Sequence, residues 1–225
     1  MRRSTAALRL FLVAVLAATL SACSAGLSEA GEPLTAQQAE ELAAARFRVY
    51  TAGPFTVSVE FGEPEGVDHA TASLTVDPEA HRAWGEVRRG PEGLAIAEEV
   101  LATPGALVVQ RDGAWRASEL STAAQLALRA VFTLVSDRPE NATLLRQSDA
   151  AFLGSVAVDG ERFSGYRLPS SGESGSSRAR IWLAADGSLH RLDAGEGSGF
   201  AILVTDEAPR PLPSGAEEVF RALEQ

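Results

Sequence analysis

Hydrophobic and polar residues follow two different periods along this chain. Over many short segments they alternate one by one, as expected for strands with one buried face and one solvent-facing face. Asp-Gly pairs, which favour tight hairpin turns, follow several of these segments. An antiparallel arrangement is therefore expected. Strands are predicted at residues 55–61, 70–76, 82–88, 93–103, 106–111, 152–158, 163–168, 179–185, 189–194 and 200–205.

Helical spacing occupies the remaining ordered stretches. Thr35 is a suitable N-cap with Gln38 three residues later, which predicts a helix over 35–50. Between 120 and 147 the spacing is helical again, and residues 124–135 leave almost no polar face, so this helix must be covered on most sides. Shorter helices are predicted at 140–147 and 216–223. This order of elements indicates one α+β domain.

The N-terminus has the features of an export signal. Two arginines precede the apolar run 10–20, which is too short to span a bilayer as a helix. Small residues then lead directly to Cys23. This order resembles the signal of a bacterial lipoprotein, which implies cleavage before Cys23 and a diacylglyceryl group on its thiol. An ordinary secretory signal with an incidental cysteine is the alternative.

The domain organisation follows from this reading of the N-terminus. Residues 1–22 are expected to be the lipoprotein signal peptide, and 23–34 a flexible tether that begins at the lipidated cysteine. The tether is expected to be flexible because it is short of bulky residues and contains glycine and proline. Residues 35–225 then form a single domain, since no repeat or internal boundary is evident.

Composition excludes several kinds of chemistry. Cys23 is the only cysteine, so its acylation leaves the body without a thiol for catalysis, a zinc–thiolate site or a disulfide. All 20 basic residues are arginine, and without lysine there is neither Schiff-base nor phosphate-loop lysine chemistry. The formal net charge of −10 falls to about −13 without the signal's three arginines, which disfavours nucleic acid and anionic lipid surfaces as partners. Membrane residence must then come from the lipid on Cys23.

Catalytic and metal-binding arrangements are not evident. The histidines lack the spacing of a ligand pair: His69, His81 and His190. His190 alternates with Leu192, so it is expected to be a partly buried structural residue. Glu98 and Glu99 are adjacent in a predicted strand and must point to opposite faces, so they cannot form an acid–base pair. No serine lies in a G-x-S-x-G motif. We therefore expect no enzymatic activity, no metal and no cofactor.

The three tryptophans have two readings. Trp84, Trp115 and Trp182 could form a stacking platform for glycans, although isolated tryptophans more often cap the end of a core. Trp84 and Trp182 share their predicted strand faces with Arg82 and Arg180. Cation–π pairs are therefore predicted on the outer surface of the sheet.

The order of elements has a family resemblance. A lipobox, a short helix, antiparallel strands, a central apolar helical segment and further strands resemble the LppX–LprAFG lipoproteins of the LolA/LolB-like superfamily. The sequence IWLAADGSLHRL at 181–192 is the piece that carries this resemblance best. It implies a strongly curved, incomplete antiparallel β half-barrel with helices packed on its concave face. The family encloses a hydrophobic cavity that carries acyl chains between membrane layers, and it has no catalytic motif to transfer.

A cavity is also compatible with the residues themselves. Ala70, Ala72, Ala83 and Gly85 are predicted to face inward opposite the bulky helical segment 126–135, which could leave unfilled volume. The alternatives are that small residues let the helix pack closely or that the glycine bends the sheet. Candidate ligand-binding residues are the inward apolar positions Val57, Val59, Phe61, Leu74, Val76, Val87, Leu128, Phe132, Ile181, Leu183 and Ile202.

These features favour a lipoprotein held on the extracytoplasmic face of the cell membrane through diacylglyceryl Cys23. It would bind a hydrophobic or lipid ligand, with lipid or lipoglycan acyl chains as partners, and carry it across the envelope. The alternative is a lipid-anchored interaction or sensor module for another envelope protein, with no ligand cavity.

Overall fold

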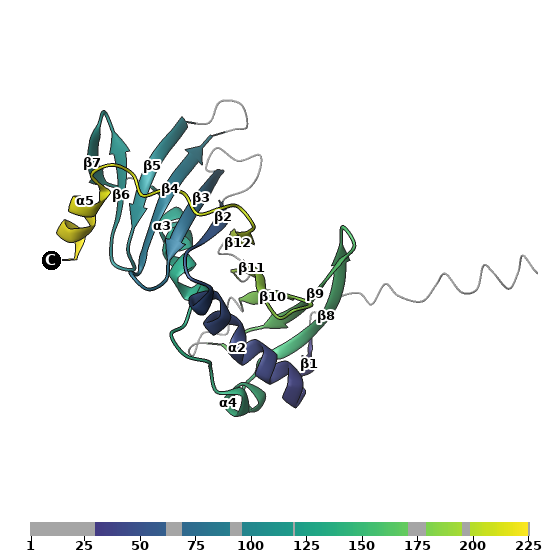
Figure 1. Ribbon diagram of the computed structural model, residues 1–225. Coiled ribbons are helices and arrows are strands. Elements are labelled where there is room, and N and C mark those ends of the chain that lie inside the picture. Colours follow the sequence, from purple (N-terminus) through teal and green to yellow (C-terminus); the bar gives the residue numbers. More distant parts are fainter. Residues whose placement is uncertain are drawn as a thin grey trace, which may run out of the picture.

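The strands of this protein form a single open sheet. The computed structural model describes residues 30–61, 69–90, 96–118, 120–170, 179–194 and 199–224, so the expected signal peptide and Cys23 lie outside the described residues. Within those residues, one twelve-stranded antiparallel sheet curves strongly without closing into a barrel (Figure 1). The predicted α+β half-barrel is therefore confirmed.

The strands are named in chain order. They are β1 (Glu32–Pro33), β2 (Phe55–Phe61), β3 (Ala70–Asp77), β4 (Arg82–Arg89), β5 (Ile96–Ala102), β6 (Leu107–Arg111), β7 (Ala114–Ala117), β8 (Ala151–Val158), β9 (Glu161–Arg167), β10 (Arg180–Ala184), β11 (Leu189–Asp193) and β12 (Phe200–Thr205). Across the sheet they lie in the order β1-β8-β9-β10-β11-β12-β2-β3-β4-β5-β6-β7. Each strand predicted from alternation has a counterpart, although residues 93–95 of the strand predicted at 93–103 lie outside the described residues, and β1 and β7 are additional.

The first strand includes residues that were expected to belong to the flexible tether. Glu32 pairs with Phe152 of β8, and Pro33 pairs with Ala151. Proline is tolerated here because β1 is an edge strand. Leu34 is buried in the core. The last residues of the expected 23–34 tether are thus part of the folded body, because edge pairing and burial of Leu34 outweigh the local flexibility that composition predicted.

The helices follow their local signals with two differences. Helix α2 (Ala36–Ala52) begins with the predicted capping box, in which Thr35 and Gln38 exchange hydrogen bonds. The central segment forms α3 (Thr122–Ala130), capped by Ser121, and then tightens into η1 (Val131–Leu134). Leu126 of α3 is 58 % exposed, so the expectation that this helix is covered on most sides is wrong at that position.

The remaining helices are short. Helix α4 (Ala142–Gln147) starts two residues later than predicted, because the side chain of Asn141 caps it by accepting hydrogen bonds from the backbone of Thr143 and Leu144. Helix α5 (Ala216–Leu223) has the predicted bounds.

The main core lies between the concave face of the sheet and the helices. Helix α3 contacts β2 and β12, whereas α2 contacts β11 and α4. Among the small inward residues, Gly85 is the one whose lack of a side chain has a specific structural cause. A Cβ atom at this position would overlap the carbonyl oxygen of Ser73 and crowd Cα of Leu74, its partner in β3. Close approach of two strand backbones therefore accounts for Gly85, and the two neighbouring strands pack without a side chain between them at this point.

The C-terminal segment crosses the opposite, convex face. In Figure 1 the yellow chain leaves β12, runs over β2–β5 and ends in α5 beside β6 and β7. The backbone NH of Arg210 donates to Oγ1 of Thr75 at 2.7 Å, and Nε1 of Trp84 donates to the carbonyl of Arg210 at 3.0 Å. A second, smaller core forms beneath α5 from Leu101, Val108, Ala216 and Phe220.

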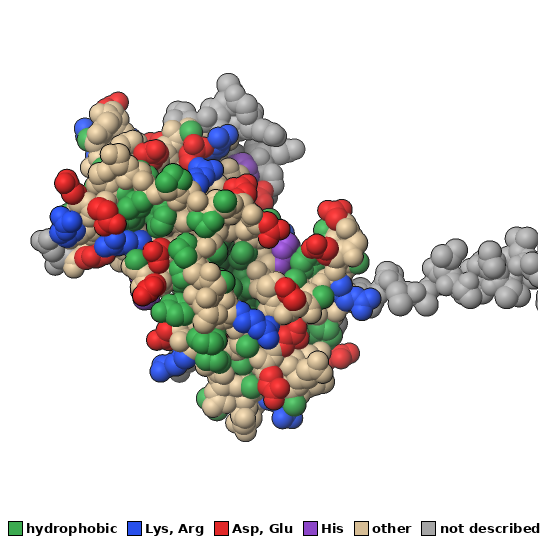
Figure 2. All heavy atoms as spheres, in the orientation of Figure 1, with side chains coloured by type: hydrophobic (Ala, Val, Ile, Leu, Met, Phe, Trp, Pro, Cys, Tyr) green, Lys and Arg blue, Asp and Glu red, His purple; other side chains and the backbone are tan. Residues whose placement is uncertain are grey.

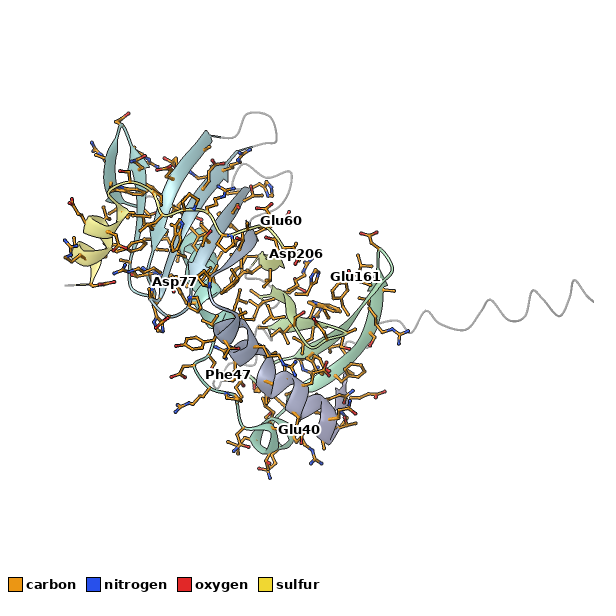
Figure 3. All side chains as sticks on the ribbon, viewed as in Figure 1. Glu40, Phe47, Glu60, Asp77, Glu161 and Asp206 are labelled. Carbon is orange, nitrogen blue, oxygen red and sulfur yellow. The ribbon has the colours of Figure 1, made fainter. Side chains whose placement is uncertain are left out.

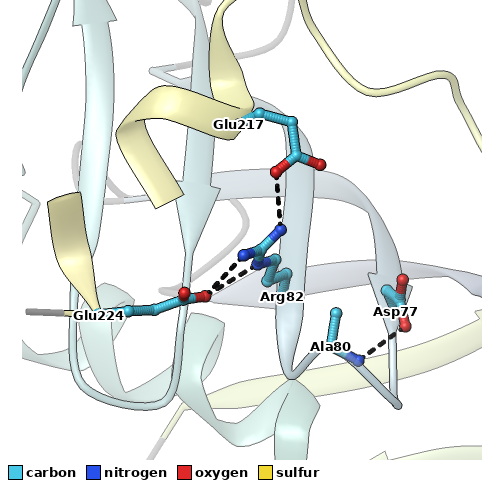
Figure 4. A network of polar contacts seen from close by, with 5 residues as sticks. All are labelled: Asp77, Ala80, Arg82, Glu217 and Glu224. Carbon is cyan, nitrogen blue, oxygen red and sulfur yellow. Dashed lines mark hydrogen bonds and ion pairs between the residues drawn. The ribbon is translucent and has the colours of Figure 1, made fainter. Parts of the chain in front are cut away.

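Charged residues hold the outside of α5. The guanidinium of Arg82 donates to Glu217 at 3.0 Å and to Glu224 at 2.8 Å (Figure 4). Its hydrogen bonds to Glu224 raise the pKa of Arg82, against the opposing effect of burial. The guanidinium also lies 4.9 Å from the ring centroid of Phe220. The aromatic partner of Arg82 is thus Phe220, supplied by the docked helix, and not Trp84.

The other tryptophan of that prediction also has a different partner. Nε1 of Trp182 donates to the carboxylate of Asp193 at 2.8 Å. Its ring covers Gly165 on the neighbouring strand so closely that a Cβ atom there would overlap the indole. Trp182 therefore packs as part of the sheet, and the predicted pairing with Arg180 gives way to this hydrogen bond and ring contact.

Candidate hydrophobic binding site

The eleven candidate ligand-binding residues come together in the structure. Ten of them are at most 3 % exposed and belong to one continuous core cluster, and Phe132 is partly buried against it. Sheet register explains their convergence, since Val57 pairs with Leu74 on one side and Val59 with Ile202 on the other. Alternation along each strand then places all inward positions on one face. In this structure the residues act as core, and ligand binding by them stays a prediction.

The three hollows described next lie away from the eleven candidate residues. Hollows of about 900, 530 and 320 Å³ are found at the strand ends near His190, beside α4, and between α2 and the β10–β11 turn, respectively. None of the eleven candidate residues lines any of these three hollows. The hollow of about 900 Å³, hereafter the mouth, falls within the size range of ligand pockets.

The mouth lies where the sheet is split. Strands β11 and β12 share a short ladder that runs from Asp193 opposite Ala201 to Arg191 opposite Leu203. Beyond it β12 continues along β2 as far as Thr205, while β11 stays with β10 as far as Leu189. The two strands therefore separate at one end, and the sheet divides there into a half ending in β11 and a half starting with β12.

Three segments line the mouth: the start of β9, the β10–β11 turn and the end of β12. Its buried wall contains Phe163 and Leu189, and Leu203 and Val204 are half-buried. Leu189 belongs to the main core, and Val204 packs against it. The mouth thus meets the main core at these two side chains.

The rim of the mouth is charged. Glu161, Arg162, Asp186 and Asp206 are exposed and line it. Figure 3 shows Glu161 on the β8–β9 hairpin and Asp206 after β12, on facing sides of the gap between the two parts of the sheet. In Figure 2, hydrophobic side chains and a histidine are visible between acidic side chains in this region.

His190 forms part of the mouth through a ring contact. Its imidazole stacks on Phe163 with centroids 4.1 Å apart and an interplanar angle of 24°. Burial and the charge of Arg191 lower the pKa of His190, while Glu161 and Asp206 act in the opposite direction. His190 forms no hydrogen bond with the described residues, and it lines the mouth.

A break in register places His190 there. The pairing of β10 with β11 shifts between Trp182 and Leu183. Leu192 joins the main core, whereas His190 stacks on Phe163, which lies three residues from the inward-facing Tyr166 and hence on the other face. The expectation of a partly buried histidine is confirmed, but its simple alternation with Leu192 is not.

Helix α2 fixes the inner side of this region. The guanidinium of Arg48 donates to the carbonyl of Gly187 at 2.9 Å in the β10–β11 turn, and occupies the space that a Cβ atom at Gly187 would need. The hydroxyl of Tyr166 donates to Glu41 at 3.0 Å, and burial together with that carboxylate raises the pKa of Tyr166. Hydrogen bonds from Ser188 lower the pKa of Asp186 in the same turn.

Sequence reasoning missed the residues of the mouth. Phe163, Leu189, Leu203 and Val204 were predicted only as strand residues, and the one local signal was the Asp-Gly turn at 186–187. Among the described residues, no group of three or more His, Cys, Asp or Glu side chains is placed to hold a metal ion. No helix in the described ranges is long and apolar enough to cross a membrane.

The architecture defines the class of protein: an open, curved antiparallel half-barrel with helices on its concave face. No protein-family model matches the chain, and no curated protein does. Among solved structures it is similar to LprF from Mycobacterium bovis, at 17 % identity over 82 % of this chain and 99 % of that chain, with a TM-score of 0.47.

Two further solved structures are similar to this chain. The lipoprotein LppX of Mycobacterium tuberculosis is 17 % identical over 78 % of this chain and 97 % of its own, with a TM-score of 0.46. The LolA superfamily protein NE2245 from Nitrosomonas europaea is 13 % identical over 83 % and 97 %, with a TM-score of 0.36. These structures include the lipoproteins that the sequence resembles, and such distant similarities place no site in this chain.

Proposed function

We propose that this protein is a lipid-anchored, extracytoplasmic binding protein that takes up the hydrophobic part of an amphiphile between its sheet and helices. The mouth serves as the entrance. The observation that carries the proposal is the position of Leu189 and Val204, which belong to the lining of the mouth and also pack in or against the main core. An acyl chain entering there would reach the apolar side chains of the main core at Leu189 and Val204.

The split between β11 and β12 offers a route inward. Separation of β11 from β12 breaks a ladder of only three residue pairs, whereas β12 and β2 share six. Each methylene group that leaves water gains about 0.8 kcal/mol, so a long acyl chain can offset the displacement of a few core side chains. The eleven candidate residues would contact the ligand only after such a displacement, because they are packed together in the empty protein.

The anchor would hold this entrance close to lipid. From Cys23 to Ala30, the first described residue, the chain has seven residue steps and reaches at most ~25 Å when extended. Two acyl chains on Cys23 are sufficient for stable anchoring. The body would therefore remain near the headgroups, where amphiphiles are abundant.

Labelling and native mass spectrometry test both parts of the proposal. The full chain, produced in a bacterium that processes lipoproteins, should incorporate labelled palmitate, and Cys23→Ala should not. The body 24–225, which contains all described residues of the single sheet and its cores, should retain lipid after mild purification from lipid-containing extract. Absence of label overturns the anchor, and lipid-free protein after exposure to lipid overturns the carrier.

A pair of substitutions locates the entrance. Val204→Trp fills the mouth and should lower the lipid-bound fraction. Leu144→Trp is the matched control, because Leu144 is 61 % exposed on α4 and does not line the mouth. Equal lipid content in the two variants would contradict entry between β11 and β12.

A second function is favoured by the packed interior. Because ten of the candidate residues are at most 3 % exposed and line none of the three hollows, the fold also suits an interaction module for another envelope protein. Recovery of a stoichiometric protein partner from membranes, with no bound lipid, would support this alternative over the carrier.

A further inference from the structure

We infer that the mouth is a headgroup site that accepts cationic amphiphiles in preference to anionic ones of the same chain length. This inference deepens the proposed function and depends on it for the hydrophobic part of the ligand. It concerns a site that the eleven candidate core residues do not include.

The first observation in favour of a cationic headgroup is the charge of the rim. Three carboxylates and one guanidinium line the mouth, from Glu161, Asp186, Asp206 and Arg162. Asp186 is already engaged, since its carboxylate accepts from the backbone of Ser188 at 2.9 Å. Glu161 and Asp206 form no ion pair with a described residue, and they lie on opposite sides of the opening. A cationic group between them would neutralise two carboxylates that the folded protein leaves unpaired.

The second observation in favour of a cationic headgroup is the aromatic wall of the mouth. The ring of His190, stacked on the buried ring of Phe163, offers an aromatic surface in the lining of the mouth. Cations are attracted to the face of an aromatic ring, and a neutral imidazole does not repel them. Burial and the charge of Arg191 lower the pKa of His190, and Glu161 and Asp206 oppose this effect. The net lowering favours the neutral imidazole at pH 7.

Size and polarity complete the match. A hollow of about 900 Å³ accommodates a compact headgroup together with the first part of an alkyl chain. The chain would run past Leu203 and Val204, while the headgroup stays at the charged rim. An anionic headgroup would instead face two unpaired carboxylates in a protein with a formal net charge of −10.

Three amphiphiles that share a decyl chain separate the contribution of the headgroup charge to binding from that of the alkyl chain. Decyltrimethylammonium, decyl maltoside and decanoate are titrated below their critical micelle concentrations into the body 24–225, with binding followed by NMR shifts of residues 161–163, 190 and 203–206. The ammonium compound should bind most tightly and decanoate least. The double variant Glu161→Gln/Asp206→Asn should weaken the ammonium compound about threefold to tenfold and leave decyl maltoside unchanged.

Glu79→Gln/Glu99→Gln is the matched control, because both residues are exposed, carry the same charge and do not line the mouth. It should leave the order of affinities unchanged. Equal affinity for the three compounds, a preference for decanoate, or an equal effect of the two double variants would overturn the headgroup inference alone. Failure of all three to shift these residues would overturn both this inference and the carrier proposal.

Discussion

The imidazole of His190 stacks on the ring of Phe163, with ring centroids 4.1 Å apart, at the point where β11 and β12 separate. The contact joins the β8–β9 hairpin to β11, on the same side of the split. A neutral imidazole suits this position, because a charged one would be desolvated against an apolar ring.

The first prediction follows from the lowered pKa of His190, which results first from burial and then from Arg191. An unfolded histidine has a pKa of about 6.5. As the pH falls through that value, the folded state binds fewer protons than the unfolded state does. The contribution of His190 to stability is therefore complete above about pH 6.5 and is lost at lower pH. Denaturation midpoints should fall between pH 7.5 and pH 5.5, and His190→Gln should reduce this fall. His81→Asn, at an exposed turn, should not. An unchanged pH dependence in His190→Gln would contradict the assignment.

The sequence predicts local features of this fold well. Alternation locates strands because the pleat places every second side chain on one face, and the Thr35–Gln38 capping box locates the start of α2 because its partners are three residues apart. Glu98 and Glu99 differ in exposure as their adjacency requires, the first buried and the second exposed.

Features that depend on distant segments could not be predicted. Nothing local marks Glu32–Pro33 as a strand, since its partner lies on β8. The mouth needs three segments spread over residues 160–206, together with a register shift that strand alternation does not reveal. The position of α5 likewise depends on Phe220 finding a site over β5 and β6, far away in the sequence.

The second prediction concerns Gly85. A methyl group at this position would overlap the backbone of Ser73 and Leu74, which cannot move without disturbing the β3–β4 ladder. Gly85→Ala should lower the free energy of unfolding by about 1–3 kcal/mol. Gly105→Ala is the control, because nothing lies within 4 Å of a Cβ atom there, and it should change stability by less than about 0.5 kcal/mol. Urea denaturation of both variants decides the matter, and equal stabilities would rule out the close approach.

The third prediction separates packing from charge in the docking of α5. Phe220 is fully buried, whereas Glu217 and Glu224 have side chains 62 % and 47 % exposed. Phe220→Ala should cost about 3–5 kcal/mol in the cooperative unit that contains α5. Glu217→Gln/Glu224→Gln should cost about 0–1 kcal/mol, because exposed ion pairs are screened by solvent. Hydrogen exchange of α5 amides and limited proteolysis after residue 206 measure the difference. Greater loss of protection in the charge variant than in Phe220→Ala would show that the ion pairs dominate.

The fourth prediction concerns a buried carboxylate at the far end of the concave face. Glu98 is 8 % exposed and forms ion pairs with Arg89 and Arg111. Burial alone would raise the pKa of Glu98, but the hydrogen bonds and charges of Arg111 and Arg89 together lower it. Its stabilising contribution is therefore present above the unfolded pKa of about 4.3 and is lost as the pH falls through the lower folded value.

Glu98→Gln should accordingly destabilise the protein at neutral pH. The neutral amide removes the negative charge that Arg89 and Arg111 share. A loss of about 1–3 kcal/mol is expected because both arginines are partly exposed. Glu99→Gln, on the exposed face of the same strand, should change stability by less than about 0.5 kcal/mol. The difference between Glu98→Gln and the unsubstituted protein should narrow from pH 7 towards pH 3 in denaturant titrations, because protonation of Glu98 produces the same neutral side chain. A difference that stays constant across this range would mean that Glu98 contributes through packing and not through its charge.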